Sequence, residues 1–265
     1  CIFDNNFSSI DKAKELYSDL TFYSDINSIL NSNIDAVFIS SPAKTHNDLV
    51  KMSLKAKKHV FVEKPLCLNY EEGVELKKLA NKSNLKLMVG HLLLYHPAFI
   101  ALKKVIDSGA IGSIRYIYSN RLSLGKLRKE EDALWSFAPH DISMILALIG
   151  DEPIKVQATG GAYLSPNVAD TSVTLLSFKK NIKAHIFVSW LHPFKDHKLV
   201  VVGEKAMIAF DDTALGEKKL TLYKHEASWS DEIPIIHKAD GEPVSYDLSK
   251  EPLKLECQSF LSWIY

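Results

Sequence analysis

The chain has 265 residues, of which 46% are hydrophobic and 24% are charged. This ordinary composition supports a globular protein whose core is large enough to need neither disulfides nor structural metals. The 32 basic and 32 acidic residues balance, so the charge gives no reason to expect nucleic acid or an anionic membrane as a partner. No apolar run approaches the roughly 18 residues of a membrane-spanning helix, and three scattered cysteines favour a reducing cytoplasm.

The sequence pattern suggests that the chain is interrupted at both ends. It begins without a methionine, directly on the strand-like residues 1–4, and residues 256–265 have the pattern of an apolar helix without a polar tail. Natural chains usually end on polar surface residues. We therefore expect a fragment. In a dinucleotide-binding unit a glycine-rich turn precedes the strand that ends on an acidic residue such as Asp4, and that turn is absent here, so about one strand and one helix are expected to be missing at the beginning.

The first third of the chain alternates short apolar strands with helices. Each strand is a continuous apolar run bounded by turn residues, which is typical of strands buried on both faces. The predicted strands cover 36–40, 60–62 and 85–89, and the predicted helices cover 47–57 and 69–82. Asn69 is suited to cap the second helix. This alternation predicts a parallel α/β sheet, and residues 1–93 are assigned to a first domain.

The pattern changes after Gly90, and residues 94–265 are assigned to a second domain. Two amphipathic helices are expected, each followed by a glycine suited to a helix C-terminus. The predicted helices cover 97–108 and 139–149, and the predicted strands cover 114–122 and successive runs between 154 and 224. Turn residues such as Gly160-Gly161 separate these runs, and the pattern predicts an antiparallel sheet.

Polar residues follow the predicted buried strands at their carboxyl ends, where open α/β sheets bind ligands. Asp4 ends the first strand, and an acidic residue there can bind the adenosine ribose of NAD and disfavour the 2′-phosphate of NADP. The turn Ser40–His46 and the triplet Glu63-Lys64-Pro65 follow two later strands. A desolvated Lys64 could exchange a proton with a substrate, although an ordinary solvated turn also explains both segments.

His140 is the candidate base of the second domain. It shares a helix face with Met144 and Leu148, and we expect it in the first helical turn, where the macrodipole disfavours the charged imidazole. A neutral imidazole is what a general base requires; a core histidine bonded to the backbone is the alternative. Asp141 points about 100° away around the helix, so we expect it to cap the helix or to interact with its dipole.

Basic residues gather between the strand 114–122 and this helix. The basic stretch, which we expect to be flexible, contains Arg121, Lys126, Arg128 and Lys129. Basic groups beside a cleft suit a phosphate-bearing substrate, although such runs are usually only solvated. The two histidines of segment 192–197 have no supporting cysteine or carboxylate cluster, so no metal site is predicted.

Four blocks follow one another along the chain: Ser41-Pro42 with His46, Glu63-Lys64-Pro65, Val89-Gly90-His91 and Tyr95-His96-Pro97. Their content and spacing resemble those of the Gfo/Idh/MocA oxidoreductases. The resemblance implies an α/β fold in which a Rossmann-like domain with a parallel sheet precedes an α/β domain with an open, mainly antiparallel sheet. It also implies a homo-oligomer assembled through that second sheet.

The resemblance further implies roles for single residues. Lys64 would lie beside the nicotinamide and the substrate hydroxyl, and His140 would transfer the proton. The residues implied along the cofactor are Asp4, Ser40, Ser41, Pro42, His46, Glu63 and Lys64, and those implied around the substrate are His91, Tyr95, Arg121, Lys126 and His140. Many members carry an aspartate four residues before the histidine, where this chain has Ser136, and this departure gives Lys64 a larger share in proton transfer.

We therefore predict a dehydrogenase that uses NAD, in preference to NADP, to oxidise a ring secondary alcohol of a sugar to a ketone. Segments 119–143 and 189–194 resemble a branch of the family that acts on sugar nucleotides, which directs the prediction to C3 of a UDP-linked amino sugar. Two alternatives remain open. One is a dehydrogenase of a free polyol or monosaccharide, and the other is a non-catalytic sensor of NAD or a sugar nucleotide.

Overall fold

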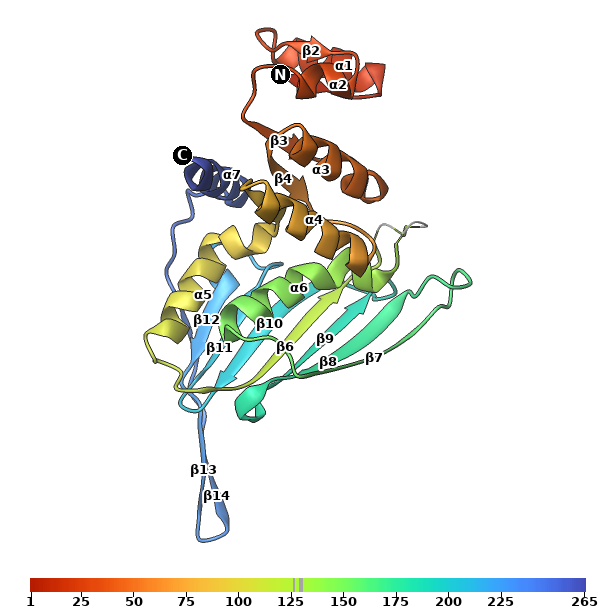
Figure 1. Cartoon of the computed structure of the whole chain (residues 1–265). Helices are drawn as coiled ribbons and strands as arrows, with labels where there is room; N and C mark the ends of the chain where they lie inside the picture. Colours follow the sequence, from red (N-terminus) through yellow and green to blue (C-terminus); the bar gives the residue numbers. More distant parts are fainter. Residues whose placement is uncertain (126, 129–130) are drawn as a thin grey trace. The chain divides into compact units, whose positions relative to one another are not determined.

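The computed structural model describes residues 1–125, 127–128 and 131–265 (Figure 1). The chain forms two compact units, one of residues 1–90 with 260–265 and one of residues 91–259. This division differs from the expected one at the C-terminal end, where the last residues group with the first unit. Within the described residues, no helix is both long and apolar enough to cross a membrane.

The first unit contains two small parallel sheets. Its strands are β1 (Ile2–Phe3), β2 (Phe22–Tyr23), β3 (Ala36–Ile39), β4 (His59–Glu63) and β5 (Leu87–Gly90), and its helices are α1 (Phe7–Leu16), α2 (Ile26–Leu30), α3 (His46–Lys55) and α4 (Tyr70–Lys82). β1 pairs with β2, and the other three strands pair in the order β3-β4-β5. Parallel strands that alternate with helices confirm the predicted α/β organisation.

Apolar side chains cover both faces of β3 and β4. On one face, Val60 belongs to a buried cluster with Leu54 of α3 and with apolar residues of α4. On the other face, the rings of Phe38 and Phe61 contact Phe260 near the end of α7 (Pro252–Ile264), with centroids 5.2 and 5.8 Å apart. This two-sided packing explains the continuous apolar runs of the sequence.

The second unit is built around one large sheet. Its helices are α5 (Pro97–Asp107) and α6 (Ala133–Ile149), and its strands are β6 (Ile114–Leu122), β7 (Lys155–Gly161), β8 (Thr171–Ser177), β9 (Lys183–Ser189), β10 (Asp196–Gly203), β11 (Met207–Asp211), β12 (Leu220–Tyr223), β13 (Glu226–Ser230), β14 (Ile233–His237) and β15 (Gly241–Pro243). Eight strands pair in the order β15-β12-β11-β10-β6-β9-β8-β7, and β13 and β14 form a separate hairpin. β6 and β9 are parallel while the other neighbours are antiparallel, which confirms the expected mixed, mainly antiparallel sheet.

Helices α5 and α6 pack on one face of this sheet (Figure 1). Alternation along β6 places Ile117 and Ser119 on the covered face, where both are fully buried. Tyr116 and Tyr118 point to the opposite face and are half-buried. In the described part of this unit no helix lies over that opposite face (Figure 1).

Two predicted boundaries in the second unit are wrong. α6 begins at Ala133, six residues before the expected start, because the Asp132 side chain caps it, and Pro139 lies inside the helix. The pair Gly160-Gly161 belongs to β7 instead of forming a turn. A side-chain carbon at Gly160 would lie 2.4 Å from the carbonyl oxygen of Thr171 on β8, so glycine permits the close pairing of these strands.

Candidate active site

The predicted site residues divide between the two units. In the first unit, β3, β4 and β5 are parallel, so the residues that follow them gather at one carboxyl edge of the sheet. Ser40 and Pro42 follow β3 and are exposed, and Ser41 between them is half-buried. This turn is therefore accessible to a ligand at the edge where open α/β sheets bind theirs.

Glu63 and Lys64 are charged residues at this edge of the sheet. They follow the buried residues Val60–Val62 of β4, and both are half-buried. Glu63 lies beside Gly90 of β5, where an added side-chain carbon would be 3.2 Å from the Oε2 atom of Glu63. The Glu63 carboxylate therefore lies beside β5 at this edge, and Lys64 is the next residue of the chain.

His46 lies between the turns that follow β3 and β4. Its side chain is buried, at 1% exposure, and its ring nitrogens are both occupied. Nδ1 lies 2.6 Å from the carbonyl oxygen of Pro65, and Nε2 lies 2.8 Å from that of Ser41. The ring thus ties the turn after β3 to the turn after β4. Its contacts in the structure are these two backbone carbonyl oxygens, and the cofactor contact of His46 stays a prediction.

Asp4 lies at the carboxyl end of β1, as predicted, and is half-buried. Its Oδ1 atom accepts a hydrogen bond of 2.8 Å from the backbone amide of Asn6, and the Asn6 side chain in turn caps α1. The turn thus fixes one carboxylate oxygen in place at the strand end. This geometry fits a carboxylate that accepts hydrogen bonds from a ribose.

In the second unit, His140 lies in the middle of α6. The helix starts at Ala133, so His140 is about two turns inside it, and the expected influence of the positive helix end does not apply. The side chain is half-buried on the helix face of the buried residues Met144 and Leu148, which confirms its inward orientation. Ser136, one turn earlier, is also buried.

Arg121 is not part of an exposed basic stretch. It points to the helix-covered face of β6 and is buried, and its Nε atom lies 2.7 Å from the Oδ2 atom of Asp141. A second guanidinium nitrogen lies 3.3 Å from Oδ1 of the same carboxylate, which also accepts a hydrogen bond from Ser119. The guanidinium of Arg121 therefore neutralises a buried carboxylate, and its contact with the substrate stays a prediction.

Asp141 also differs from its expected role. It is fully buried, at 0% exposure, and Asp132 is the residue that caps α6. Arg121 and Asp141 together attach the middle of α6 to β6. Lys126, also predicted to contact the substrate, lies outside the described residues, and Arg128 forms an ion pair of 3.0 Å with Glu131.

His197 joins this buried group and was not predicted. It lies on β10 opposite Arg121, and its Nδ1 atom is 3.2 Å from the NH1 atom of that arginine. Burial, followed by the charge of Arg121, lowers the pKa of His197 to about 4. The alternation of β10 with the buried residues Leu199 and Val201 was the sequence signal that places this histidine inside.

His91 and Tyr95 lie close to α6, the helix that carries His140. His91 precedes a short 3-10 helix, Leu92–Tyr95, and Tyr95 is its last residue. This short helix packs against α6, and both side chains are half-buried. The second unit thus brings His91, Tyr95 and His140 to neighbouring elements. Among the described residues, no three histidine, cysteine or acidic side chains form a group that could hold a metal ion.

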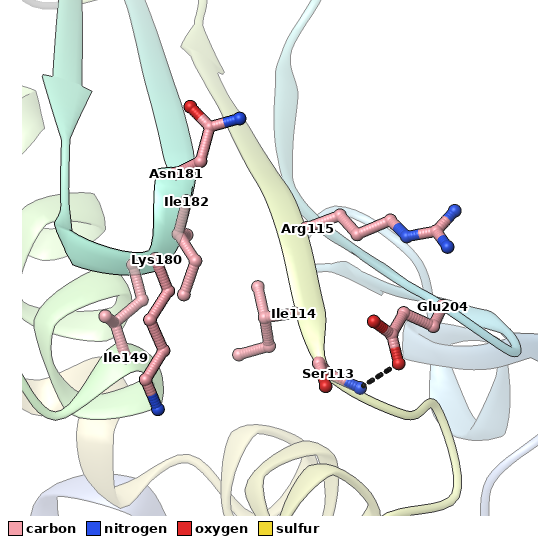
Figure 2. Close-up of a pocket in the computed structure, with 8 residues that line it drawn as sticks. All are labelled: Ser113, Ile114, Arg115, Ile149, Lys180, Asn181, Ile182 and Glu204. Carbon is pink, nitrogen blue, oxygen red and sulfur yellow. Dashed lines mark hydrogen bonds between the residues drawn. The ribbon is translucent and has the colours of Figure 1, made fainter.

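A cavity of about 710 Å³ opens elsewhere on the second unit (Figure 2). It is lined by Ser113, Ile114, Arg115, Ile149, Lys180, Asn181, Ile182 and Glu204. The backbone amide of Ser113 donates to the Glu204 carboxylate at 3.4 Å. Arg115 and Arg121 are six residues apart on an extended strand, or roughly 20 Å, so this cavity is separate from the predicted site residues.

The two halves of the chain match two descriptions of one family. Residues 1–91 match "Oxidoreductase family, NAD-binding Rossmann fold", and residues 99–209 match "GFO/IDH/MocA C-terminal domain". Together the matches cover most of the chain, which belongs to the Gfo/Idh/MocA family of oxidoreductases. The resemblance inferred from the four sequence blocks is thereby confirmed.

Several relatives within this family carry named activities. UDP-N-acetylglucosamine 3-dehydrogenase of Acidithiobacillus ferrooxidans is 29% identical over 191 residues, which are 71% of this chain and 58% of that protein. Inositol 2-dehydrogenase of Rhizobium meliloti is 31% identical over 144 residues, or 52% of this chain and 44% of that protein. A solved structure of UDP-N-acetylglucosamine 3-dehydrogenase GnnA from A. ferrooxidans has a TM-score of 0.79 and 25% identity, and covers 99% of this chain and 79% of that one. The chain thus spans less than two thirds of these two curated relatives.

Proposed function

We propose that the full-length protein is a cytoplasmic, NAD-dependent dehydrogenase that oxidises a secondary alcohol on a sugar ring to a ketone. One observation carries the proposal: a member of an NAD-binding oxidoreductase family presents a candidate proton-transfer residue in each unit, Lys64 at a sheet edge and His140 on α6. NAD, when bound, supplies the acceptor of the hydride. The alcohol carbon gives up a hydride and its hydroxyl gives up a proton, so the sugar loses two electrons in all.

We assign the hydroxyl proton to His140, with a share for Lys64. A neutral imidazole or a neutral amine can accept it, and the cation that results stabilises negative charge on the nascent carbonyl oxygen. The buried Ser136 stands one turn before His140, where many family members carry an aspartate. A hydroxyl supports an imidazolium less strongly than a carboxylate does, and this difference favours a part for Lys64.

We propose that Asp4 makes the enzyme prefer NAD, because its carboxylate accepts hydrogen bonds from the ribose and repels a 2′-phosphate. Asp4→Ala should weaken NAD binding and reduce the preference for NAD over NADP by about tenfold, the equivalent of one good hydrogen bond. Fluorescence titration of the full-length protein with both cofactors measures this. Asp11→Ala, on the exposed part of α1, is the control. Unchanged selectivity would show that Asp4 is not the ribose ligand.

The substrate we propose is a UDP-linked amino sugar, oxidised at C3. The named activity of the A. ferrooxidans relative supports this choice. The burial of Arg121 removes one of the basic groups that had suggested a phosphate-bearing substrate. The inositol dehydrogenase of R. meliloti supports the alternative that the substrate is a free polyol. A larger kcat/KM for inositol than for a UDP-sugar would favour that alternative, and tight NAD binding without any turnover would favour a sensor.

We further propose that the protein forms a homo-oligomer through the uncovered face of the large sheet. This face carries the half-buried apolar residues Tyr118, Phe187, Val200 and Met207, and apolar surface of this kind marks an interaction site. Val200→Asp should therefore shift the molar mass measured by light scattering toward the monomer. Val156→Asp, on the exposed strand β7, is the control. A monomeric wild type would contradict the proposal.

A further inference from the structure

Resting on the proposed dehydrogenase function, we propose that His197 is a further substrate-binding residue, which donates a hydrogen bond from Nε2 to an oxygen of the sugar. His197 lies near the start of β10, on the helix-covered face of the sheet. No predicted site included it. Its tautomer, its burial and its place beside α6 support this role.

Arg121 fixes the tautomer of the His197 ring. Its NH1 atom lies 3.2 Å from Nδ1 of His197, and a guanidinium can only donate hydrogen bonds. Nδ1 is therefore the acceptor, which leaves the proton of the neutral ring on Nε2. Asp141 holds the arginine in turn, since its carboxylate lies 2.7 Å from Nε of Arg121. The orientation of the imidazole thus depends on a buried ion pair.

The His197 ring stays neutral at physiological pH. Its side chain is only 11% exposed, and burial, with the nearby charges of Arg121 and Lys195, lowers its pKa to about 4. Asp212, 4.0 Å away, and Asp196 oppose this shift without reversing it. A neutral ring whose Nδ1 is occupied has one N–H group to offer, and that group is at Nε2.

Nε2 of His197 is buried, and no residue in the described part of the chain forms a hydrogen bond with it. A buried N–H group without an acceptor is unfavourable, because it has lost its water and gained no replacement. In our proposal, an oxygen of the bound sugar supplies the missing bond. Sugars suit this position because hydroxyl oxygens around the ring accept hydrogen bonds.

His197 also lies next to the helix that carries the proposed base. Its ring meets the Phe137 ring of α6 edge-on, with centroids 6.0 Å apart. Phe137 precedes His140 by three residues, which makes the two side chains neighbours on the helix surface. We infer from this contact that a sugar with one hydroxyl at His140 places a second oxygen of the same ring at His197. Two such contacts would determine which carbon of the ring is oxidised.

Kinetics of His197 variants in the full-length protein test this role. His197→Phe removes the donor and should raise the KM for the sugar about tenfold, while the KM for NAD and the Tm stay close to wild type. His197→Gln places an amide N–H near the position of Nε2 and should bring the KM back to within about threefold. His237→Phe, on the exposed strand β14, is the matched control and should leave the KM unchanged.

Deoxy substrates separate a direct contact from a structural effect, and the His197→Gln variant carries this test if His197→Phe does not fold. With the wild type, kcat/KM for the analogue without the contacted hydroxyl should be about tenfold lower than for the complete sugar. With His197→Phe, the analogue and the complete sugar should have the same kcat/KM. The proposal would be overturned if the KM of His197→Phe stays within about twofold of wild type. It would also be overturned if, for every analogue, the loss in kcat/KM from the missing hydroxyl simply adds to the loss from the substitution. A wild type that oxidises no sugar or polyol would instead overturn the dehydrogenase function on which it rests.

Discussion

Replacing His140 with alanine should lower the kcat of the full-length enzyme by about 10²–10⁴-fold, the usual range for loss of a general acid or base. His140 lies on the inward face of α6 with Met144 and Leu148. Its removal takes away the proposed proton acceptor and leaves the cofactor residues of the first unit intact. The absorbance of reduced nicotinamide at saturating sugar and NAD gives kcat.

His192→Ala is the matched control for this experiment. Its Nδ1 atom is bonded to the carbonyl oxygen of Phe194, and we assign it no part in the reaction. The control should keep kcat close to wild type. A loss under about threefold in His140→Ala would contradict the role of His140. In that case Lys64 would be the remaining candidate for the proton acceptor, and Lys64→Met should abolish turnover.

Replacing Asp141 with asparagine should lower the free energy of unfolding by about 3–5 kcal/mol. The substitution keeps the size of the side chain but removes the charge that neutralises Arg121. Both residues are buried, with a contact of 2.7 Å between Nε and Oδ2. An uncompensated guanidinium in this position would lack both water and a counter-charge. Urea denaturation of the full-length protein, with unfolding of the second unit followed separately, measures the effect.

Two further variants make this stability prediction specific. Replacing both partners, with Asp141→Leu and Arg121→Met, should recover most of the loss because no buried charge remains. Asp107→Asn breaks an ion pair of 2.9 Å with Lys103 on the surface and should cost at most about 1 kcal/mol. An Asp141→Asn variant that loses no more than the surface control would show that the buried pair does not stabilise the fold.

Local signals in the sequence predicted much of the fold. Asn69 caps α4 as expected, accepting hydrogen bonds from the amides of Glu71 and Glu72. Gly150 ends α6 in a left-handed conformation with φ of 72°, which favours glycine. The alternation over 114–122 predicted β6 with its correct bounds and faces. These features depend on residues close together in the chain, so their pattern is visible without the tertiary structure.

The expectations for the start of α6 and for Arg121 are wrong because two local signals in the sequence conflict at each position. The proline signal predicts that α6 starts at Pro139, although Asp132 provides a cap seven residues earlier and the helix accommodates the proline. The run of basic residues predicts that Arg121 belongs to an exposed stretch, although the alternation of β6 places it on the face of Ile117 and Ser119. Strand periodicity was the stronger predictor here, because burial of the whole face sets where each side chain points.

The remaining features depend on long-range pairing. Helix α6, strands β7 and β8 and a short 3-10 helix lie between the parallel neighbours β6 and β9 in the chain, and no local pattern predicts that register. The contacts of Arg121 with Asp141 and with His197 join three elements in the same way. The candidate residues Lys64 and His140 were visible in the sequence, whereas the buried group that holds His197 became visible only in the structure.

The central claim is that the full-length protein transfers a hydride from a sugar carbon to NAD, and the absorbance of reduced nicotinamide tests it most directly. UDP-N-acetylglucosamine, its glucuronate analogue and free inositol would be mixed with NAD in turn. We expect reduction with a UDP-linked sugar and little with inositol. Binding of NAD without reduction by any sugar or polyol in a wider panel would contradict the dehydrogenase function.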